Sequence, residues 1–352
     1  MGYEKNLRKV VPYVPGEQPQ NTNIIKLNTN ENPYGPTPRV EEAIKTIKTD
    51  VDRMRLYPPV DAGILAKAIS KYYGIDEKKL FIGVGSDDVL SVAFLTCFNS
   101  EKPVLFPNIT YSFYDVWADL YKIPFEQLPL DENFKINRED YLKENGGIVI
   151  ANPNAPTSLE MPLEDIEFIV KNNPDSVVII DEAYVDFGAE TALPLLDKYD
   201  NILVVQTFSK SRSMAGNRIG FCFGSEKIIK AMNDVKFSIN SYTMNYPSIV
   251  LGCAAVEDVD YFNQQCAKII KTREESAAEL KKLGFKVLDS KTNFLFVSHE
   301  GVKAEKIFAD LKNRGIYVRY FKKPIIDNYL RITIGTDEQM KALIDALKEI
   351  LA

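Results

Sequence analysis

Short, uninterrupted apolar runs alternate with segments of helical periodicity along most of this chain. The runs are rich in β-branched and aromatic residues, as buried strands are. A strand that is apolar at every position is buried on both faces, which occurs in parallel sheets covered by helices. We therefore predict an α/β fold with a mostly parallel sheet and helices on both of its faces. The runs span residues 104–106, 148–150, 177–180, 202–205 and 219–223.

The helical segments lead into a second, smaller unit. A long helical stretch over 247–283 ends at Gly284, and glycine commonly terminates helices. Strands and helices mix beyond it, which predicts a small α+β domain. The predicted helices are 61–73, 87–98, 111–121 and 302–313 with one more at the end of the chain, and the later strands are 293–297, 316–320 and 330–334.

The length of 352 residues exceeds what one hydrophobic core usually serves, so we expect more than one domain. Residues 1–38 are rich in proline, asparagine and glycine, and we predict an N-terminal arm that packs with the small domain and with a partner subunit. Residues 39–245 form the predicted large cofactor-binding domain. Residues 246–352 form the predicted interdomain helix and small C-terminal domain.

The composition excludes several classes of function. A net charge of −6 and no basic stripe argue against a nucleic-acid partner. No apolar stretch approaches membrane-spanning length, and the charged residues 1–10 do not look like a secretory signal, so we expect a cytoplasmic protein. The cysteines show no metal-binding spacing, so we expect reduced packing residues and no metal; they are Cys97, Cys222, Cys253 and Cys266.

The chain has a single histidine, His299, in a polar turn. A serine or cysteine catalytic triad, or a histidine-rich metal site, would have to use that one residue. Acid–base chemistry is therefore expected from lysine, carboxylate or tyrosine side chains.

A lysine and an aspartate stand at the carboxyl ends of predicted strands, where open α/β sheets bind their ligands, and an arginine follows the lysine eight positions on. Lys210 follows the run 202–205, and a partly buried lysine beside cations loses its proton and can form an imine with an aldehyde. Arg218 lies among glycines and suits bidentate phosphate binding. Asp181 follows the run 177–180, and its carboxylate can pair with the protonated nitrogen of an aromatic ring. Tyr184, three residues on, can donate a hydrogen bond to the 3′-oxygen of that ring. These residues indicate pyridoxal phosphate.

Other interpretations of single motifs stay open. A carboxylate such as Asp181 also holds magnesium in nucleotide hydrolases, although the phosphate loop that accompanies it there is absent. Gly85, Ser86 and Asp87 predict a strand-to-helix turn whose N–H groups bind an anion, or else an ordinary helix N-cap. Tyr111 is either an aromatic that stacks on a cofactor ring or a core residue.

As a set, these residues resemble the fold-type I aminotransferases, in particular the class-II pyridoxal-phosphate-dependent family. Within it they resemble the branch that acts on L-histidinol phosphate. The resemblance covers essentially the whole chain and implies an aspartate-aminotransferase-like fold. Its motifs are Pro-Tyr-Val-Pro-Gly at 12–16, Leu-Asn-Thr-Asn-Glu-Asn-Pro-Tyr-Gly-Pro at 27–36, Tyr-Pro at 57–58, Gly-Ser-Asp at 85–87, Asp-Glu-Ala-Tyr at 181–184, Ser-Lys at 209–210 with Arg218, and Leu-Arg-Ile-Thr at 330–333.

The resemblance implies roles for individual residues. Lys210 would hold the cofactor and shuttle a proton once the substrate displaces it, and Tyr111 would stack on the ring. Tyr57 would reach the cofactor phosphate of the neighbouring subunit, which makes the enzyme a homodimer with shared sites. The phosphate of the cofactor would be held by Ser86, Asp87, Thr207, Ser209 and Arg218, and the anionic end of the substrate by Arg331 with Tyr13, Asn30 and Arg319.

One segment departs from the family pattern. Where an asparagine usually contacts the 3′-oxygen of the ring, residues 152–158 read Asn-Pro-Asn-Ala-Pro-Thr-Ser. Asn154 either takes that role after a small shift of the loop or only shapes the turn.

The resemblance implies transfer of an amino group between L-histidinol phosphate and the 2-oxo acid 2-oxoglutarate, in L-histidine biosynthesis. Two alternatives share the scaffold. One is an aromatic amino-acid aminotransferase, and the other is a lyase, threonine-phosphate decarboxylase. The orientation of the Cα bonds against the ring decides between deprotonation and decarboxylation, and the sequence does not show it.

Overall fold

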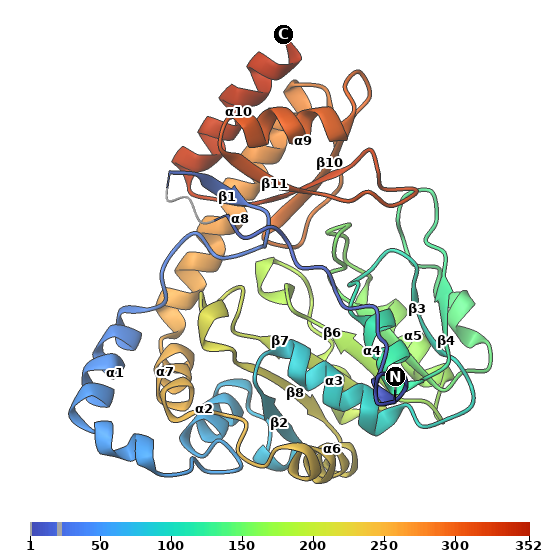
Figure 1. The fold of residues 1–352 in the computed structure, drawn as a ribbon, viewed down its shortest axis with the longest axis vertical. Helices are drawn as coiled ribbons and strands as arrows, with labels where there is room; N and C mark the ends of the chain where they lie inside the picture. The colour runs from blue at the N-terminus through green and yellow to red at the C-terminus, as the bar shows by residue number, and fades with distance from the viewer. Residues whose placement is uncertain (1, 20–22) are drawn as a thin grey trace.

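A seven-stranded sheet forms the centre of the larger part of the molecule (Figure 1). The structure is a computed structural model that describes residues 2–19 and 23–352. Strand β8 runs antiparallel to both of its neighbours, whereas the other pairs of neighbouring strands are parallel. The prediction of a mostly parallel sheet is therefore confirmed. In order across the sheet the strands are β2 (Leu80–Gly83), β8 (Gly220–Gly224), β7 (Ile202–Thr207), β6 (Val178–Asp181), β5 (Gly147–Ala151), β3 (Val104–Pro107) and β4 (Phe125–Leu128).

Alternate residues of the central strands pack on opposite faces of this sheet, as the two-residue repeat of a strand requires. In β6, Val178 and Ile180 join the hydrophobic cluster of one face, while Ile179 joins the cluster of the other. Because both faces are covered, these strands are apolar up to the polar residues at their carboxyl ends, such as Asp181 in β6 and Thr207 in β7. The first face is covered by α2 (Ile64–Tyr73), α5 (Leu163–Asn172) and α7 (Tyr246–Glu257), and the second by α3 (Ser86–Cys97), α4 (Tyr114–Tyr121) and α6 (Glu226–Ile239).

A smaller, five-stranded sheet lies beyond the carboxyl ends of the central strands (Figure 1). Strand β1 (Ile25–Leu27) comes from the N-terminal arm and pairs in parallel with β11 (Ile316–Tyr320). The arm therefore reaches the small sheet before the chain enters α1 (Pro38–Thr49), which packs on α7. The other strands are β12 (Leu330–Thr333), β10 (Phe294–His299) and β9 (Phe285–Val287), and the helices are α8 (Val259–Lys282), α9 (Ala304–Asn313) and α10 (Asp337–Leu351).

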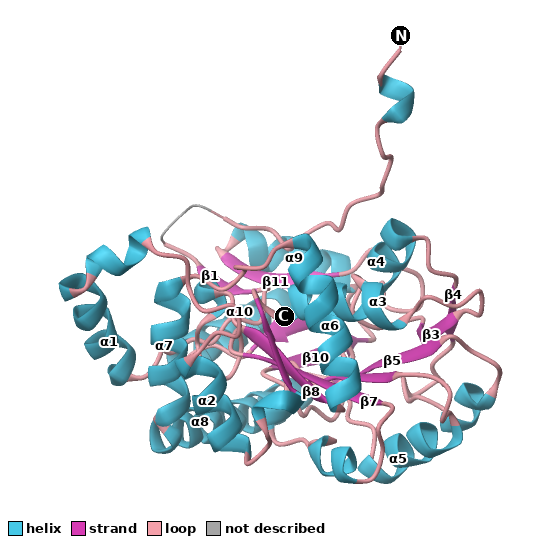
Figure 2. Cartoon of the chain, turned by 90° about the horizontal axis from the view of Figure 1, so that it is seen from below, coloured by secondary structure: helices cyan, strands magenta, loops and turns pink. Residues whose placement is uncertain are grey.

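The first residues of the arm extend away from the body of the molecule (Figure 2). Val10, Val11 and Val14 are exposed there. Among the described helices, none is both long and apolar enough to cross a membrane.

Several helix boundaries differ from the sequence-based prediction. The stretch predicted as one helix over 247–283 is interrupted at Asp258, whose side chain accepts a hydrogen bond from the N–H of Tyr261 and caps α8. The helix predicted to begin at Tyr111 begins at Tyr114 instead. Tyr111 therefore lies in the loop before α4 and not in the helix.

Candidate active site

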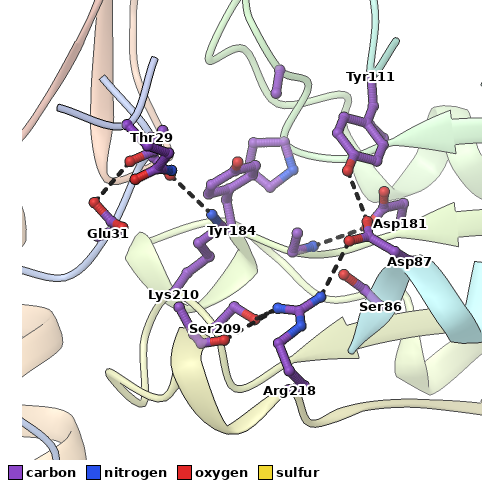
Figure 3. A pocket seen from close by; sticks show the side chains of 16 residues that line it. Thr29, Glu31, Ser86, Asp87, Tyr111, Asp181, Tyr184, Ser209, Lys210 and Arg218 are labelled. Atoms are coloured by element: carbon purple, nitrogen blue, oxygen red, sulfur yellow. Dashed lines mark hydrogen bonds and ion pairs between the residues drawn. The ribbon is translucent and has the colours of Figure 1, made fainter. Parts of the chain in front are cut away.

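A cavity of about 240 Å³ lies where β6 and β7 end and α3 begins (Figure 3). The N-terminal arm closes part of it, because Gln18, Thr29 and Glu31 contribute to its wall. Many of the residues predicted from the sequence meet here, although they are far apart along the chain. They are Ser86, Asp87, Tyr111, Asp181, Tyr184, Ser209, Lys210 and Arg218.

Lys210 projects into this cavity from the loop after β7. Its side chain is partly buried, and Nζ donates a hydrogen bond to the backbone oxygen of Thr29 at 3.3 Å. Burial, and then the positive charge of Arg331, lower the pKa of the Lys210 amine to about 8. A useful fraction of this amine is therefore neutral, and so nucleophilic, near neutral pH.

Asp181, the last residue of β6, supplies a buried carboxylate. Its Oδ2 accepts a hydrogen bond from the hydroxyl of Tyr114 at 2.8 Å, and its Oδ1 accepts one from the N–H of Ala183 at 3.3 Å. Burial raises the pKa of Asp181 to about 6, although these two hydrogen bonds oppose the rise. In Figure 3, Lys210 and Asp181 enter the cavity from opposite sides, so an acid faces the amine across the open space.

A guanidinium group, that of Arg218, lies at one end of the cavity. The Arg218 guanidinium lies 3.5 Å from the hydroxyl oxygen of Ser209 and 3.2 Å from Asp87 Oδ2. Gly85 has a φ of +94°, and a Cβ at that position would lie 2.5 Å from Arg218 Nη2. Only glycine therefore allows this approach of the guanidinium to the start of α3.

The turn before α3 decides between the two interpretations of that motif. Its N-cap residue is Gly85, and no side chain caps the helix. Asp87 instead accepts a hydrogen bond from Tyr111 Oη at 2.7 Å and pairs with Arg218. The ordinary Ser/Asp N-cap is thus not what the structure has, and the helix N-terminus faces the cavity beside Ser86.

A second cavity of about 150 Å³ adjoins the first and shares Lys210, Tyr184 and Tyr111 with it. Two arginines, Arg319 and Arg331, line this second cavity together with Tyr13 and Asn30. Two guanidinium groups in one small cavity favour a doubly charged or carboxylate anion.

The anion-binding capacity of Arg331 is only partly used. Its Nη2 donates to the backbone oxygen of Asn28 at 2.8 Å, whereas its Nε is buried and has no hydrogen-bond partner within the described part of the chain. Burial lowers the pKa of Arg331, although arginine stays charged. A buried donor without a partner is costly, so an incoming anion would gain a hydrogen bond here.

Asn30 joins the two cavities through Tyr184. It lies in the left-handed region, with a φ of 57°, and is almost fully buried. Its side-chain amide donates to Tyr184 Oη at 2.8 Å, and its Oδ1 accepts from the hydroxyl of Thr333 at 3.1 Å. Asn30 therefore ties the arm to strand β12 and to the segment after β6, and it orients the phenol of Tyr184.

Besides Gly85, which precedes α3, three predicted residues line neither cavity. Asn154 donates to the backbone oxygen of Ile109 and to Thr157 Oγ1, and accepts from Thr110 Oγ1, all at 2.8–2.9 Å. Because the turn uses its whole amide, the structure does not bring Asn154 to the cavity. Ala155 lies in the wall there instead.

The other two are Thr207 and Tyr57. The Thr207 hydroxyl lies 3.0 Å from Ser209 Oγ and so supports the anion end from behind. Tyr57 is 81% exposed and stacks on Tyr242, with 4.5 Å between ring centroids. It lines neither of the two cavities.

Sequence reasoning missed Tyr114 and two arm residues, Thr29 and Glu31. Thr29 and Glu31 lie inside the motif at 27–36, which gave a signal for the segment but not for single side chains. Tyr114 lies 67 positions from Asp181 along the chain, and their contact arises only from the packing of α4 on the sheet. No local pattern marks such a pair.

The residues present fit the pyridoxal phosphate expected from the sequence. An amine of lowered pKa stands across the cavity from a buried acid, and a guanidinium and two hydroxyls stand at one end. Within the described ranges, no group of three or more histidine, cysteine, aspartate or glutamate side chains is placed to hold a metal ion.

Comparison with known proteins agrees with this geometry. Residues 22–347 match the family model described as aminotransferase class I and II. The chain is 51% identical over 351 residues to the histidinol-phosphate aminotransferase of Lactococcus lactis subsp. cremoris, covering 100% of this chain and 98% of that one. It is 50% identical over 350 residues to the enzyme of the same name from Clostridium acetobutylicum, covering 99% of each.

A solved structure shares the fold. The histidinol-phosphate aminotransferase from Sinorhizobium meliloti, in complex with pyridoxal-5′-phosphate, matches with a TM-score of 0.85 at 24% identity. The match covers 93% of this chain and 90% of that chain.

Proposed function

The chain belongs to the class I and II aminotransferase family, and from this premise we propose that it is a pyridoxal-phosphate-dependent enzyme that transaminates L-histidinol phosphate in L-histidine biosynthesis. The products would be imidazole-acetol phosphate and, with 2-oxoglutarate as the acceptor, L-glutamate. One observation carries the proposal: Lys210 lies at the junction of a cavity with an acid opposite the amine and a second cavity with two arginines. The relatives at about 50% identity have this activity in their names.

The first cavity would hold the cofactor. Ser86, Ser209 and Arg218 would bind its phosphate, Asp181 would face the ring nitrogen, and Tyr184 the 3′-oxygen, with Tyr111 against the ring. Pyridoxal phosphate supplies an aldehyde that binds amines and a ring that withdraws electrons from the substrate Cα. Asp181 would support this withdrawal, because its carboxylate would stabilise a positive charge on the ring nitrogen.

Lys210 has two tasks in this proposal. Its Nζ would hold the cofactor between turnovers and, once the substrate frees it, would move the proton between the substrate Cα and the cofactor carbon. A base works best when its pKa lies near the working pH, and the lowered value of about 8 meets this condition.

Arg331 and Arg319 would bind the phosphate of the amine donor and, in the second half of the reaction, the carboxylate of the oxo acid. Arg331 Nε is a donor without a hydrogen-bond partner in the described part of the chain, and Nη2 is oriented by its hydrogen bond to the backbone oxygen of Asn28. The arm residues Asn28 to Glu31 cover the junction of the two cavities, which limits the access of water to Lys210.

We also propose that the enzyme is a homodimer with shared sites. Residues 51–60 and the end of α6 expose large apolar side chains that a monomer in water would leave uncovered. The two segments are in contact, because Tyr57 stacks on Tyr242 and Lys236 Nζ donates to the backbone oxygen of Val60. The exposed apolar residues here are Val51, Met54, Leu56, Tyr57, Val60, Phe237, Ile239 and Tyr242.

A cytoplasmic location is part of the proposal. All four cysteines are free in the structure, in agreement with a reducing compartment. We also propose domain boundaries near residues 38 and 245, which divide the chain into an arm, a large domain and a small domain.

The experiment that tests this function uses purified holoenzyme with L-histidinol phosphate and 2-oxoglutarate. We expect imidazole-acetol phosphate and glutamate in equal amounts. Absence of turnover with fully loaded cofactor would contradict the proposal. Higher kcat/KM with phenylalanine or tyrosine would favour the aromatic aminotransferase, and release of carbon dioxide from threonine phosphate would favour the decarboxylase.

A further inference from the structure

The hydroxyl of Tyr114 donates a hydrogen bond of 2.8 Å to Asp181 Oδ2. Tyr114 has no exposed surface and Asp181 is only 5% exposed, so water does not compete for this bond. Tyr114 opens α4 on one face of the large sheet, whereas Asp181 ends β6 at the sheet's carboxyl edge. The contact therefore joins the aromatic core of that face to the acid of the active site.

The ring of Tyr114 is held on several sides. It meets Phe106 edge to face at 5.9 Å and lies stacked beside Phe94 at 6.1 Å between ring centroids. It also meets Tyr111 edge to face at 5.7 Å, and Tyr111 lines both cavities. Because such packing leaves the ring no alternative rotamer, the direction of the hydroxyl is fixed before any cofactor arrives.

Because of this bond, the two oxygens of the Asp181 carboxylate have different hydrogen-bond partners. Oδ2 is occupied by Tyr114, and Oδ1 receives the long hydrogen bond of 3.3 Å from the N–H of Ala183. A carboxylate oxygen has two lone pairs, so Oδ1 keeps one for a group in the cavity. The charge of the carboxylate is thus aimed at the cavity that Lys210 faces.

The surroundings of Asp181 otherwise oppose its charge. Burial is the largest influence and raises its pKa, and the negative charge of Asp87 acts in the same direction. Of the influences that lower the pKa, the hydrogen bond from Tyr114 comes first, followed by the N–H of Ala183 and the positive charge of Lys210. Burial of the neighbouring phenols keeps Tyr111, Tyr114 and Tyr184 protonated, so Tyr114 remains a donor.

We propose that Tyr114 is a positioning residue that orients the Asp181 carboxylate and keeps it ionised for the ring nitrogen of the cofactor. The inference rests on the proposed function for the cofactor, but not for the substrate. Tyr114 touches neither cavity and acts only through Asp181. A tyrosine that merely filled the core would be replaced by phenylalanine without any effect on the ring nitrogen.

The test compares wild type with Tyr114→Phe, both loaded with pyridoxal phosphate carrying ¹⁵N in its ring. Without the donor the carboxylate becomes more basic and draws the proton away from the ring. We therefore expect the ¹⁵N signal to move toward the unprotonated position, and kcat to fall about 10-fold with KM little changed, since one pKa unit corresponds to a factor of ten. Tyr141→Phe is the matched control, a buried tyrosine on the other face of the sheet.

A second measurement does not depend on how well Tyr114→Phe folds. 3-Fluorotyrosine at position 114 keeps the phenol ring and its hydroxyl donor. Its ¹⁹F signal should move when the cofactor binds, because the cofactor's ring nitrogen then interacts with the Asp181 carboxylate that Tyr114 contacts. An unchanged ¹⁵N signal in a folded Tyr114→Phe, or an unchanged ¹⁹F signal on cofactor binding, would overturn the inference. If both signals shift but histidinol phosphate is not turned over, the positioning role of Tyr114 is supported and the proposed substrate is wrong.

Discussion

Asn32 donates its side-chain amide to the backbone oxygens of Lys210 at 3.1 Å and of Ser211 at 3.3 Å. Its own Oδ1 accepts from the N–H of Tyr34 at 3.0 Å, which fixes the amide. From the other side, the hydroxyl of Ser211 donates to Asp186 Oδ2 at 2.5 Å. The backbone that carries Lys210 is therefore held both by the arm and by the loop after β6.

Asn32→Ala should reduce kcat/KM about 10-fold while leaving the fold intact. Two hydrogen bonds of roughly 0.5–1.5 kcal/mol each are lost, and the lysine backbone gains freedom at the atom that must be placed most accurately. Steady-state kinetics with histidinol phosphate measure the change. Asn133→Ala, in an exposed turn, is the control, and equal rates for the two variants would show that the arm does not position Lys210.

The pKa of Lys210 predicts how fast apoenzyme captures pyridoxal phosphate at different pH values. The amine is lowered from its ordinary value to about 8, so it is mostly protonated and unreactive below pH 8 and mostly neutral above it. The capture rate, followed by absorbance, should rise through a midpoint near pH 8.

Arg331 supplies part of this lowering, second to burial. Arg331→Gln removes a positive charge from the surroundings of the amine and should move the midpoint to higher pH. Arg319→Gln is the matched control from the same cavity, since Arg319 is not among the main influences on Lys210. A midpoint that stays in place in Arg331→Gln would contradict this account.

The sequence predicted the parallel sheet and most of the first cavity because strand ends converge. Lys210 and Asp181 each follow an apolar run, and parallel strands bring their carboxyl ends to one edge. The alternation of Ile148, Val149 and Ile150 between the two faces explains why such runs are visible without any structure.

What the sequence-based prediction missed in the site depends on contacts between distant segments. It also omitted helices α5 and α6, although their apolar residues recur on one face as in an amphipathic helix. The sequence allows the side chain of Asn154 to contact the cofactor, but in the structure its whole amide is used within the turn. Tyr114 could not be separated from its aromatic neighbours, because only the fold points its hydroxyl at Asp181.

Thr336→Ala should destabilise the small sheet's last helix by about 1 kcal/mol. Thr336 and Gln339 form a capping box at the start of α10: the N–H of Gln339 donates to Thr336 Oγ1 at 3.3 Å, and the N–H of Thr336 donates to Gln339 Oε1 at 2.9 Å. Amide hydrogen exchange in the first turn of α10 measures the loss. Thr336→Ser keeps the hydroxyl and should restore protection, and equal exchange in both variants would argue against the cap.

Mixing two inactive variants tests whether Tyr57 serves the neighbouring subunit. Lys210→Ala removes the amine, and Tyr57→Ala removes the exposed phenol, which lines neither cavity of its own chain. A mixed dimer has one site that combines Lys210 from one subunit with Tyr57 from the other, and this site is intact. Random exchange of subunits should therefore restore about a quarter of the wild-type activity per site, since half of the dimers are mixed and each has one intact site of two.

The control for this experiment uses two variants that damage the same subunit's cavity. Lys210→Ala mixed with Asp181→Ala should stay inactive, because both residues line one cavity and neither mixed site is complete. If the Tyr57→Ala mixture also stays inactive while exchange of differently tagged subunits is verified, Tyr57 acts within its own chain or not at all. The exposed apolar segment around Tyr57 would then need another partner, since burial of that surface is what the proposed dimer provides.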